Sequence, residues 1–146
     1  MTRPASPLAF PPRTVMLIRW IDFFADRATL QVEDLSHRLL ADEQVGLTDV
    51  VLTELLQGAR DDGELARLED YLAPFEVARL QSLEDFRLAA ALYRAGRKAG
   101  TPIRTTTDCL IAAVCIREGL PLLHDDRDFD HLTTVSDLTV IRSPRS

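Results

Sequence analysis

The sequence predicts an α/β fold built on a parallel sheet. Short apolar runs, typical of buried strands, alternate along the chain with longer segments whose apolar residues recur at helical spacing. Strands that are separated by helices favour parallel pairing, because a parallel pair needs a crossover connection. The chain has 146 residues, of which 46% are apolar, enough for one domain with a proper core.

The first half of the chain begins with a predicted strand over residues 14–18, an apolar and partly β-branched run. Helical segments are predicted over residues 20–24 and 29–41, and a short strand over residues 44–47. Thr48 is a suitable N-cap for a helix over residues 49–58. The core stripe of that helix is predicted to be Val51, Leu52, Leu55 and Leu56.

The second half continues with a helix over residues 64–71 and an alternating segment, residues 75–80, that predicts a strand. A long helix is predicted over residues 83–99, ending at Gly100. Residues 138–141 predict a closing strand. The inward face of the long helix is predicted to hold Phe86, Ala89, Ala90 and Tyr93.

Residues 105–130 carry the densest pattern in the chain. Asp108 is predicted to open a helix that Gly119 ends, in the position where a left-handed residue is usual. The apolar run over residues 120–124 predicts a buried parallel strand. A loop with four acids is predicted to follow it: Asp125, Asp126, Asp128 and Asp130.

These acids predict a metal site at one edge of the sheet. Ligands of open α/β sheets bind beyond the carboxyl ends of the strands. Asp126 and Asp128 follow a strand, and Asp108 begins the helix that leads into it. Crowded carboxylates are tolerated when they spread into water or when Mg²⁺ or Mn²⁺ neutralises them. The alternative interpretation is a polar loop together with a helix-capping aspartate.

Further charged residues have two interpretations each. Glu54 lies among apolar residues of its helix, so it either faces water at the rim or belongs to a site. Arg94 and Arg97 fall in the last turns of the long helix, and Arg104 is close in sequence to Asp108. The basic residues either stabilise the helix C-terminus or contact phosphates beside the acids.

Composition excludes some classes of protein. The net charge of −6 argues against a general nucleic-acid coat protein, but a bound metal lets an acidic nuclease work. Cys109 and Cys115 would lie about 9 Å apart along one helix, too far for a disulfide, which predicts reduced core thiols and a cytoplasmic protein. No segment predicts a membrane span. Residues 1–13 predict a disordered proline-rich leader, residues 14–142 one domain and residues 143–146 a tail.

Three motifs in this order resemble PIN-domain ribonucleases, and among them the VapC toxins of type II toxin–antitoxin pairs. The motifs are WIDFF near the start, LTDVVLTELLQG, and TTTDCLIAAVCIREGLPLLHDDRDFD. The resemblance runs from about residue 15 to residue 141. It implies a three-layer α/β/α PIN-like domain and cleavage of RNA that depends on Mg²⁺ or Mn²⁺, with tRNA as one substrate to test. It also implies a homodimer and a small VapB-like antitoxin.

The resemblance assigns roles to particular residues. Glu54, Asp108 and Asp126 match the catalytic acids and metal ligands, and Asp128 matches an auxiliary metal-binding acid. Arg94, Arg97 and Arg104 are not assigned by the resemblance, but their position near the acids makes them candidates to hold the RNA backbone. Asp125 and Asp130 have no matching role and are interpreted as solvated.

The first strand departs from the family pattern. The family places an aspartate at the end of that strand, where this chain has Arg19. Asp22 is the nearest acid and a weak candidate for the missing ligand. Either Asp22 replaces it, or the remaining acids suffice, or Arg19 occupies the place of the metal. The last case predicts a catalytically impaired PIN-fold protein that still dimerises and binds an antitoxin.

Two unrelated classes fit less well. Asp126, Asp128 and Asp130 resemble the start of a calcium-binding EF-hand loop, but His131 stands where that loop needs glycine and Asp137 where it needs glutamate. A flavodoxin-like or receiver domain would carry its acids after the first strand. In this chain the candidate acids of the densest pattern lie between residues 108 and 130, far from the first predicted strand.

Overall fold

The structure is a computed structural model that describes residues 15–17, 45–124 and 127–142. The predicted leader, the two predicted helices between residues 20 and 41, Arg19, Asp22, Asp125, Asp126 and the tail lie outside these ranges. In chain order the elements are β1 (Val15–Leu17), β2 (Val45–Thr48), α3 (Asp49–Gln57), α4 (Asp62–Leu72), β3 (Glu76–Ala78), α5 (Leu83–Lys98), α6 (Thr106–Glu118), β4 (Leu122–His124), α7 (Arg127–Thr133) and β5 (Val140–Arg142).

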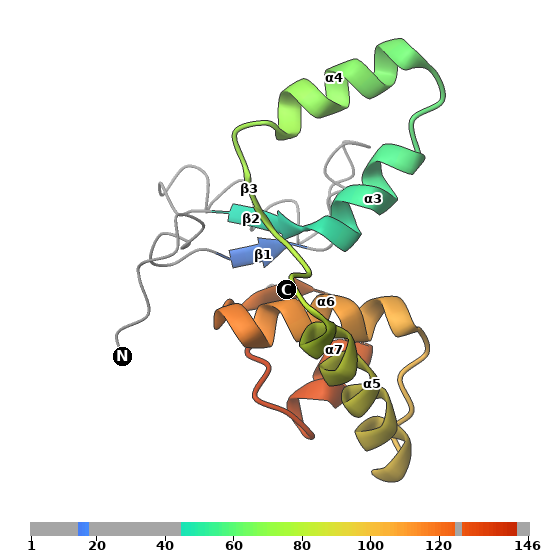
Figure 1. The fold of residues 1–146 in the computed structure, drawn as a ribbon, viewed down its shortest axis with the longest axis vertical. Coiled ribbons are helices and arrows are strands. Elements are labelled where there is room, and N and C mark those ends of the chain that lie inside the picture. The colour runs from blue at the N-terminus through green and yellow to red at the C-terminus, as the bar shows by residue number, and fades with distance from the viewer. Residues whose placement is uncertain (1–14, 18–44, 125–126, 143–146) are drawn as a thin grey trace.

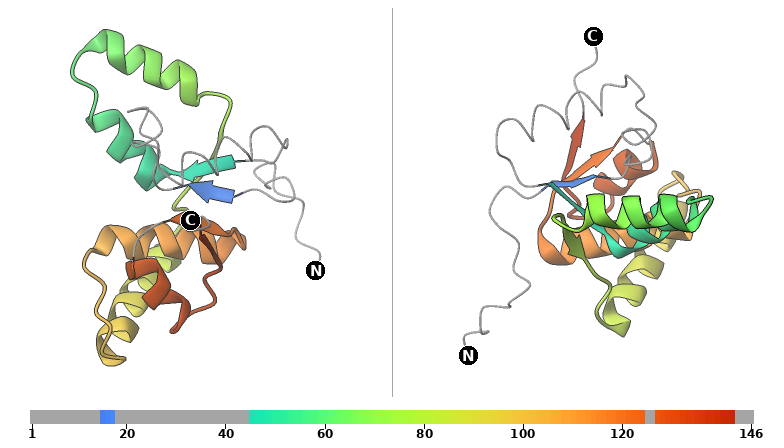
Figure 2. Two further views of the ribbon diagram at one scale, coloured as in Figure 1. Left: turned by 180° about the vertical axis from the view of Figure 1, so that it is seen from behind. Right: turned by 90° about the horizontal axis from the view of Figure 1, so that it is seen from above.

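The strands form a parallel sheet in the order β3-β2-β1-β4-β5. Met16 of the central strand β1 is in register with Gly46 on one side and with Leu122 on the other. Every strand pair in the described ranges is parallel, as the sequence predicts. Figure 1 shows α3 and α4 on one side of the strands and α5, α6 and α7 on the other, and the reverse view in Figure 2 agrees. Helices therefore cover both faces of the sheet.

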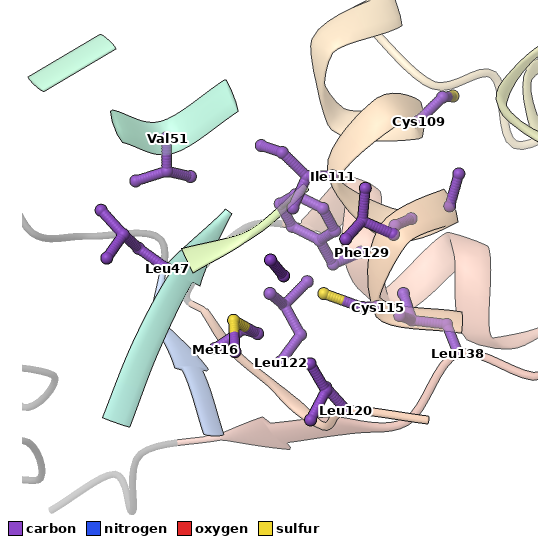
Figure 3. Packing of buried hydrophobic residues seen from close by; sticks show 14 of the residues in the cluster. Met16, Leu47, Val51, Cys109, Ile111, Cys115, Leu120, Leu122, Phe129 and Leu138 are labelled. Carbon is purple, nitrogen blue, oxygen red and sulfur yellow. The ribbon is translucent and has the colours of Figure 1, made fainter. Parts of the chain in front are cut away.

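Helix α6 forms the centre of the core. Residues 111–115 are all buried, because this helix is enclosed by the sheet on one side and by α5 and α7 on the other. Figure 3 shows Ile111 and Cys115 of α6 beside Leu122 and Phe129. Its C-terminus follows the sequence signal, because Gly119 ends the helix with φ of +66°, whereas the N-terminus is capped by the Thr105 hydroxyl. The helix therefore begins at Thr106, two residues before the predicted start at Asp108.

Both cysteines pack in this core as free thiols, as predicted. Burial raises the pKa of Cys109 to about 11, with a further contribution from the charges of Asp108 and Asp128, and burial raises the pKa of Cys115 to about 12. Both side chains are therefore neutral at physiological pH.

The predicted inward face of α5 is wrong for three of its four residues. Ala89 is buried, but Phe86, Ala90 and Tyr93 face solvent. The buried residues of the helix are instead Asp85, Ala89, Leu92 and Gly96. Helix α5 is therefore rotated about its axis relative to the predicted orientation. Two features account for this: Asp85 forms an ion pair with Arg117 inside the protein, and Gly96 lets the helix lie close to Ile103.

This ion pair joins the start of α5 to the end of α6. Arg117 Nε donates to Asp85 Oδ1 at 2.7 Å, and the N–H of Gln81 donates to Asp85 Oδ2 at 2.7 Å. The guanidinium also donates to the carbonyl of Arg79 and to the carboxylate of Glu118. Burial alone would raise the pKa of Asp85, but the hydrogen bonds from Arg117 and the backbone outweigh it and lower that pKa.

The predicted acidic loop after β4 is also different, because residues 127–133 form helix α7. Phe129 and Leu132 lie three residues apart and are both buried, so the segment has an apolar face for the core. Asp128 and Asp130 fall in the first turn, where negative charge favours a helix.

No helix in the described ranges is long and apolar enough to cross a bilayer.

We predict that Gly46→Ala destabilises the protein, because a Cβ at this position would lie 2.8 Å from the carbonyl oxygen of Glu76 and 2.7 Å from Met16 Cε. Overpacking of this kind costs about 1–3 kcal/mol in the free energy of unfolding. Urea denaturation measures it. Gly63→Ala is the control, since its Cβ meets nothing closer than 3.4 Å; an equal loss in both variants would contradict the packing argument.

We predict that Asp85→Asn lowers the free energy of unfolding by about 3 kcal/mol at pH 7, because it leaves the partly buried Arg117 without its main partner. The pKa of Asp85 is lowered from 3.8, so the pair stabilises the fold above that pH and stops doing so as the pH falls through the folded-state pKa. The difference between the variant and the wild type should therefore shrink below about pH 3.8. Glu84→Gln, which breaks an exposed pair on the same turn, should have little effect at either pH.

Candidate active site

The candidate site lies at the edge of the sheet where the parallel strands end. Asp108 sits in the first turn of α6, which runs against the strand direction and so begins at this edge. Its backbone N–H donates to the Thr105 hydroxyl at 3.2 Å, which fixes the turn that carries its carboxylate. Asp128 lies in the first turn of α7, which starts just beyond the end of β4. The topology thus brings together two acids that are 20 residues apart in the sequence.

Asp128 is held by Arg104, a residue of the segment between α5 and α6. The Arg104 backbone N–H donates to Asp128 Oδ2 at 3.1 Å, and Arg104 Nε lies 3.3 Å from Oδ2 and 3.4 Å from Oδ1. The side chain of Asp128 is only 4% exposed, whereas that of Arg104 is 69% exposed. Arg104 is therefore a partner of an acid as well as an exposed basic residue, and its contact with RNA stays a prediction.

Asp108 and Asp128 are neighbours, since both contribute to the electrostatics of Cys109 and Asp108 contributes to those of Asp128. Burial alone would raise the pKa of Asp128. The hydrogen bonds from the Arg104 backbone, from Asp108 and from the Arg104 guanidinium, together with the charge of Arg104, outweigh burial and lower that pKa. Asp128 is therefore ionised at neutral pH and lies against a second carboxyl group.

This pair of carboxyl groups fits a hard divalent cation in the chemistry of its donors. Oxygen ligands are those that Mg²⁺ and Mn²⁺ prefer, and a cation relieves the repulsion of adjoining carboxylates. Within the ranges that the structure describes, no three His, Cys, Asp or Glu side chains are grouped closely enough to hold a metal ion. The predicted third acid, Asp126, lies outside those ranges.

Glu54 is exposed near the C-terminal end of α3. That helix begins at the same edge of the sheet, where Thr48 caps it through a 3.2 Å hydrogen bond from the Val51 N–H. The described residues do not gather Glu54 with Asp108 and Asp128 into one group of ligands. Its metal-binding role therefore remains a prediction.

The other two predicted basic residues are exposed on α5. The Arg97 guanidinium lies 5.9 Å from the centre of the Tyr93 ring, a cation–π distance. Arg94 and Arg97 thus form part of the outer surface of α5. Neither is among the partners of Asp128.

One buried residue that contacts an acid of this segment, His124, was not singled out by the sequence. His124 is buried at the end of β4, with its ring centre 5.2 Å from that of Phe129. Its Nε2 lies 3.5 Å from Asp130 Oδ1, so Asp130, interpreted from the sequence as solvated, is partly buried against this histidine. The only signal in the sequence was that His124 ends an apolar run.

A comparison with protein-family models matches residues 17–134 to the PIN domain. The chain is also 34% identical over 121 residues to VapC ribonuclease Mb1587 of Mycobacterium bovis and to Ribonuclease VapC11 of Mycobacterium tuberculosis, covering 82% of this chain and 90% of each relative. The chain is a PIN-domain protein of the VapC type.

Solved structures of similar fold include VapBC2 from Rickettsia felis bound to a promoter DNA fragment, with a TM-score of 0.68 and 17% identity over 88% of this chain and 98% of that one. VapBC-5 from Mycobacterium tuberculosis matches with a TM-score of 0.61 and 26% identity over 90% of this chain and 99% of that one. These likenesses confirm the three-layer PIN fold that the sequence predicts.

Proposed function

We propose that this protein is a metal-dependent endoribonuclease and the toxin of a type II toxin–antitoxin module. The observation that carries the proposal is the placement of Asp108 and Asp128 in the first turns of α6 and α7, at the carboxyl edge of the sheet, in a chain similar to VapC ribonucleases. A nuclease needs a place where a cation and a phosphate meet, and the carboxylate of Asp108 at this edge of the sheet provides a ligand for the cation.

The proposal assigns a role to the predicted acidic and basic residues of the site. Asp108 and Asp126 hold the ion, Mg²⁺ or Mn²⁺, which when bound supplies Lewis-acid activation of water and neutralises charge on the phosphate. Glu54 or Asp126 orients the attacking water and accepts its proton. Arg94 and Arg97, exposed on α5, contact the RNA backbone and position it without reading its sequence.

We predict that Asp108→Asn lowers RNA cleavage by at least about 100-fold, since the loss of a metal ligand removes several kcal/mol of transition-state stabilisation. Cleavage of a tRNA pool with Mn²⁺ and with EDTA measures the effect. Asp62→Asn, which changes an exposed acid on the distant α4, is the control. Cleavage that survives both EDTA and the Asp108 change would contradict the proposal.

A second candidate function is a PIN-fold protein with an impaired site that still dimerises and binds an antitoxin. The sequence observation in its favour is Arg19, which stands where the family carries its first aspartate. A guanidinium binds carboxylates through two hydrogen bonds and can take the place of a cation. Wild-type protein that folds but neither binds Mn²⁺ nor cleaves RNA would favour this function over the first.

The proposed partners are a small VapB-like antitoxin and a second copy of the chain. Several of the similar solved structures are complexes of VapB and VapC proteins, which supports the antitoxin. For the second copy, the described surface offers one apolar stripe along α5. Leu83 is 63% exposed, Phe86 48% and Tyr93 36%.

This stripe is self-complementary if two α5 helices pack antiparallel across a two-fold axis. The exposed Ala90 lies at the centre of the stripe, where a small side chain allows close approach of the two helices. The axis then sets Phe86 of one copy near Tyr93 of the other. It also sets the acidic first turn, with Glu84, against the basic last turn, with Lys98.

We predict that Phe86→Lys weakens self-association at least about 10-fold, because it removes an apolar anchor and places a charge beside the basic end of the partner helix. Sedimentation equilibrium over a range of concentrations measures the dissociation constant. Tyr71→Lys changes an exposed aromatic residue on α4 and is the control. A monomeric wild type, or equal association of all three proteins, would exclude this surface.

A further inference from the structure

We infer that Asp128 is a positioning residue that orients Asp108 and is not itself a ligand of the metal. The inference rests on the proposed function, because it assigns roles within the same site. It departs from the role that the family resemblance gives this acid. The group concerned, called here the Asp128 bracket, consists of the Asp128 carboxylate and the backbone N–H of Arg104, the residue that immediately precedes the N-cap of α6.

The hydrogen bonds of Asp128 are directed into the protein. Oδ2 accepts from the Arg104 backbone N–H and from Nε, and Oδ1 lies 3.4 Å from the same Nε. A carboxylate has about four lone-pair positions, so these contacts use most of them. With its side chain only 4% exposed, Asp128 has little capacity left for an ion that arrives from solvent.

The bracket acts on the main chain rather than on a mobile side chain. The Arg104 guanidinium is mostly exposed, so its pairing with Asp128 is screened by water. The backbone N–H of Arg104 is fixed by the fold, and it immediately precedes Thr105, the N-cap of α6. Asp128 therefore ties the entry of α6 to α7 and sets the position of Asp108 on the first turn.

Asparagine at position 128 separates the two roles. Its side-chain oxygen can accept from the Arg104 N–H, so the bracket persists without the charge. A metal ligand, in contrast, would lose its ionic bond on this change. Alanine removes the bracket and the charge together. The pair of variants therefore distinguishes positioning from ligation.

The experiment is calorimetric titration of Mn²⁺ into the full-length wild type and into Asp128→Asn, Asp128→Ala and Asp108→Asn, with thermal unfolding in EDTA as the check on folding. We expect Asp128→Asn to keep the dissociation constant for Mn²⁺ within about 3-fold of the wild type. Asp128→Ala should weaken binding about 10- to 100-fold, as loss of a group that orients a ligand does. Asp108→Asn should weaken it more than either.

Two results would overturn the inference while leaving the proposed function in place. One is binding by Asp128→Asn as weak as that of Asp108→Asn, which would make Asp128 a ligand. The other is wild-type affinity in Asp128→Ala, which would remove its positioning role. If Asp128→Ala does not fold, the comparison of the two asparagine variants decides alone. Wild-type affinity in Asp108→Asn would instead overturn the proposed metal site, and the inference with it.

Discussion

The burial of α6 is the constraint on which the rest of the structure depends. This helix packs between the sheet on one side and α5 and α7 on the other. Packing on several sides therefore fixes both the direction of its axis and its position along the sheet. Its N-terminal turn must then lie at the edge where the strands end. Asp108 reaches that edge because it belongs to the first turn of a helix that cannot lie elsewhere.

Most of the sheet and its order of elements could be predicted from the sequence, because each signal is local. Apolar runs predicted β1, β2 and β4 within one or two residues, and Thr48 and Gly119 marked helix ends through their own conformations. The orientation of α5 could not be predicted in this way. Apolar periodicity placed Phe86 inward, whereas a charged residue, Asp85, is the buried one. Its partner Arg117 is 32 residues away, beyond the reach of any local pattern.

The candidate site, like the fold, could be predicted from the sequence only in part. The sequence placed Asp108 and Asp128 at one sheet edge, because strand and helix order alone determine which ends meet. It did not predict that Arg104 would hold Asp128, since the two residues are 24 positions apart and Arg104 resembled a surface base. Nor did it predict α7, because four acids in six positions outweighed the two apolar residues, Phe129 and Leu132, that bury this segment.

The pairs at the two ends of α6 also limit how the length of this helix can change. Arg117 meets Asp85 at one end, and the segment leading into the other end is tied to Asp128. The helix has 13 residues, and one inserted residue would turn everything after it by about 100° around the axis. Arg117 would then point away from Asp85, or Asp108 away from Asp128. An insertion or deletion in α6 should therefore break one of these contacts, whereas a change of length in the exposed turn between α3 and α4 should leave both in place.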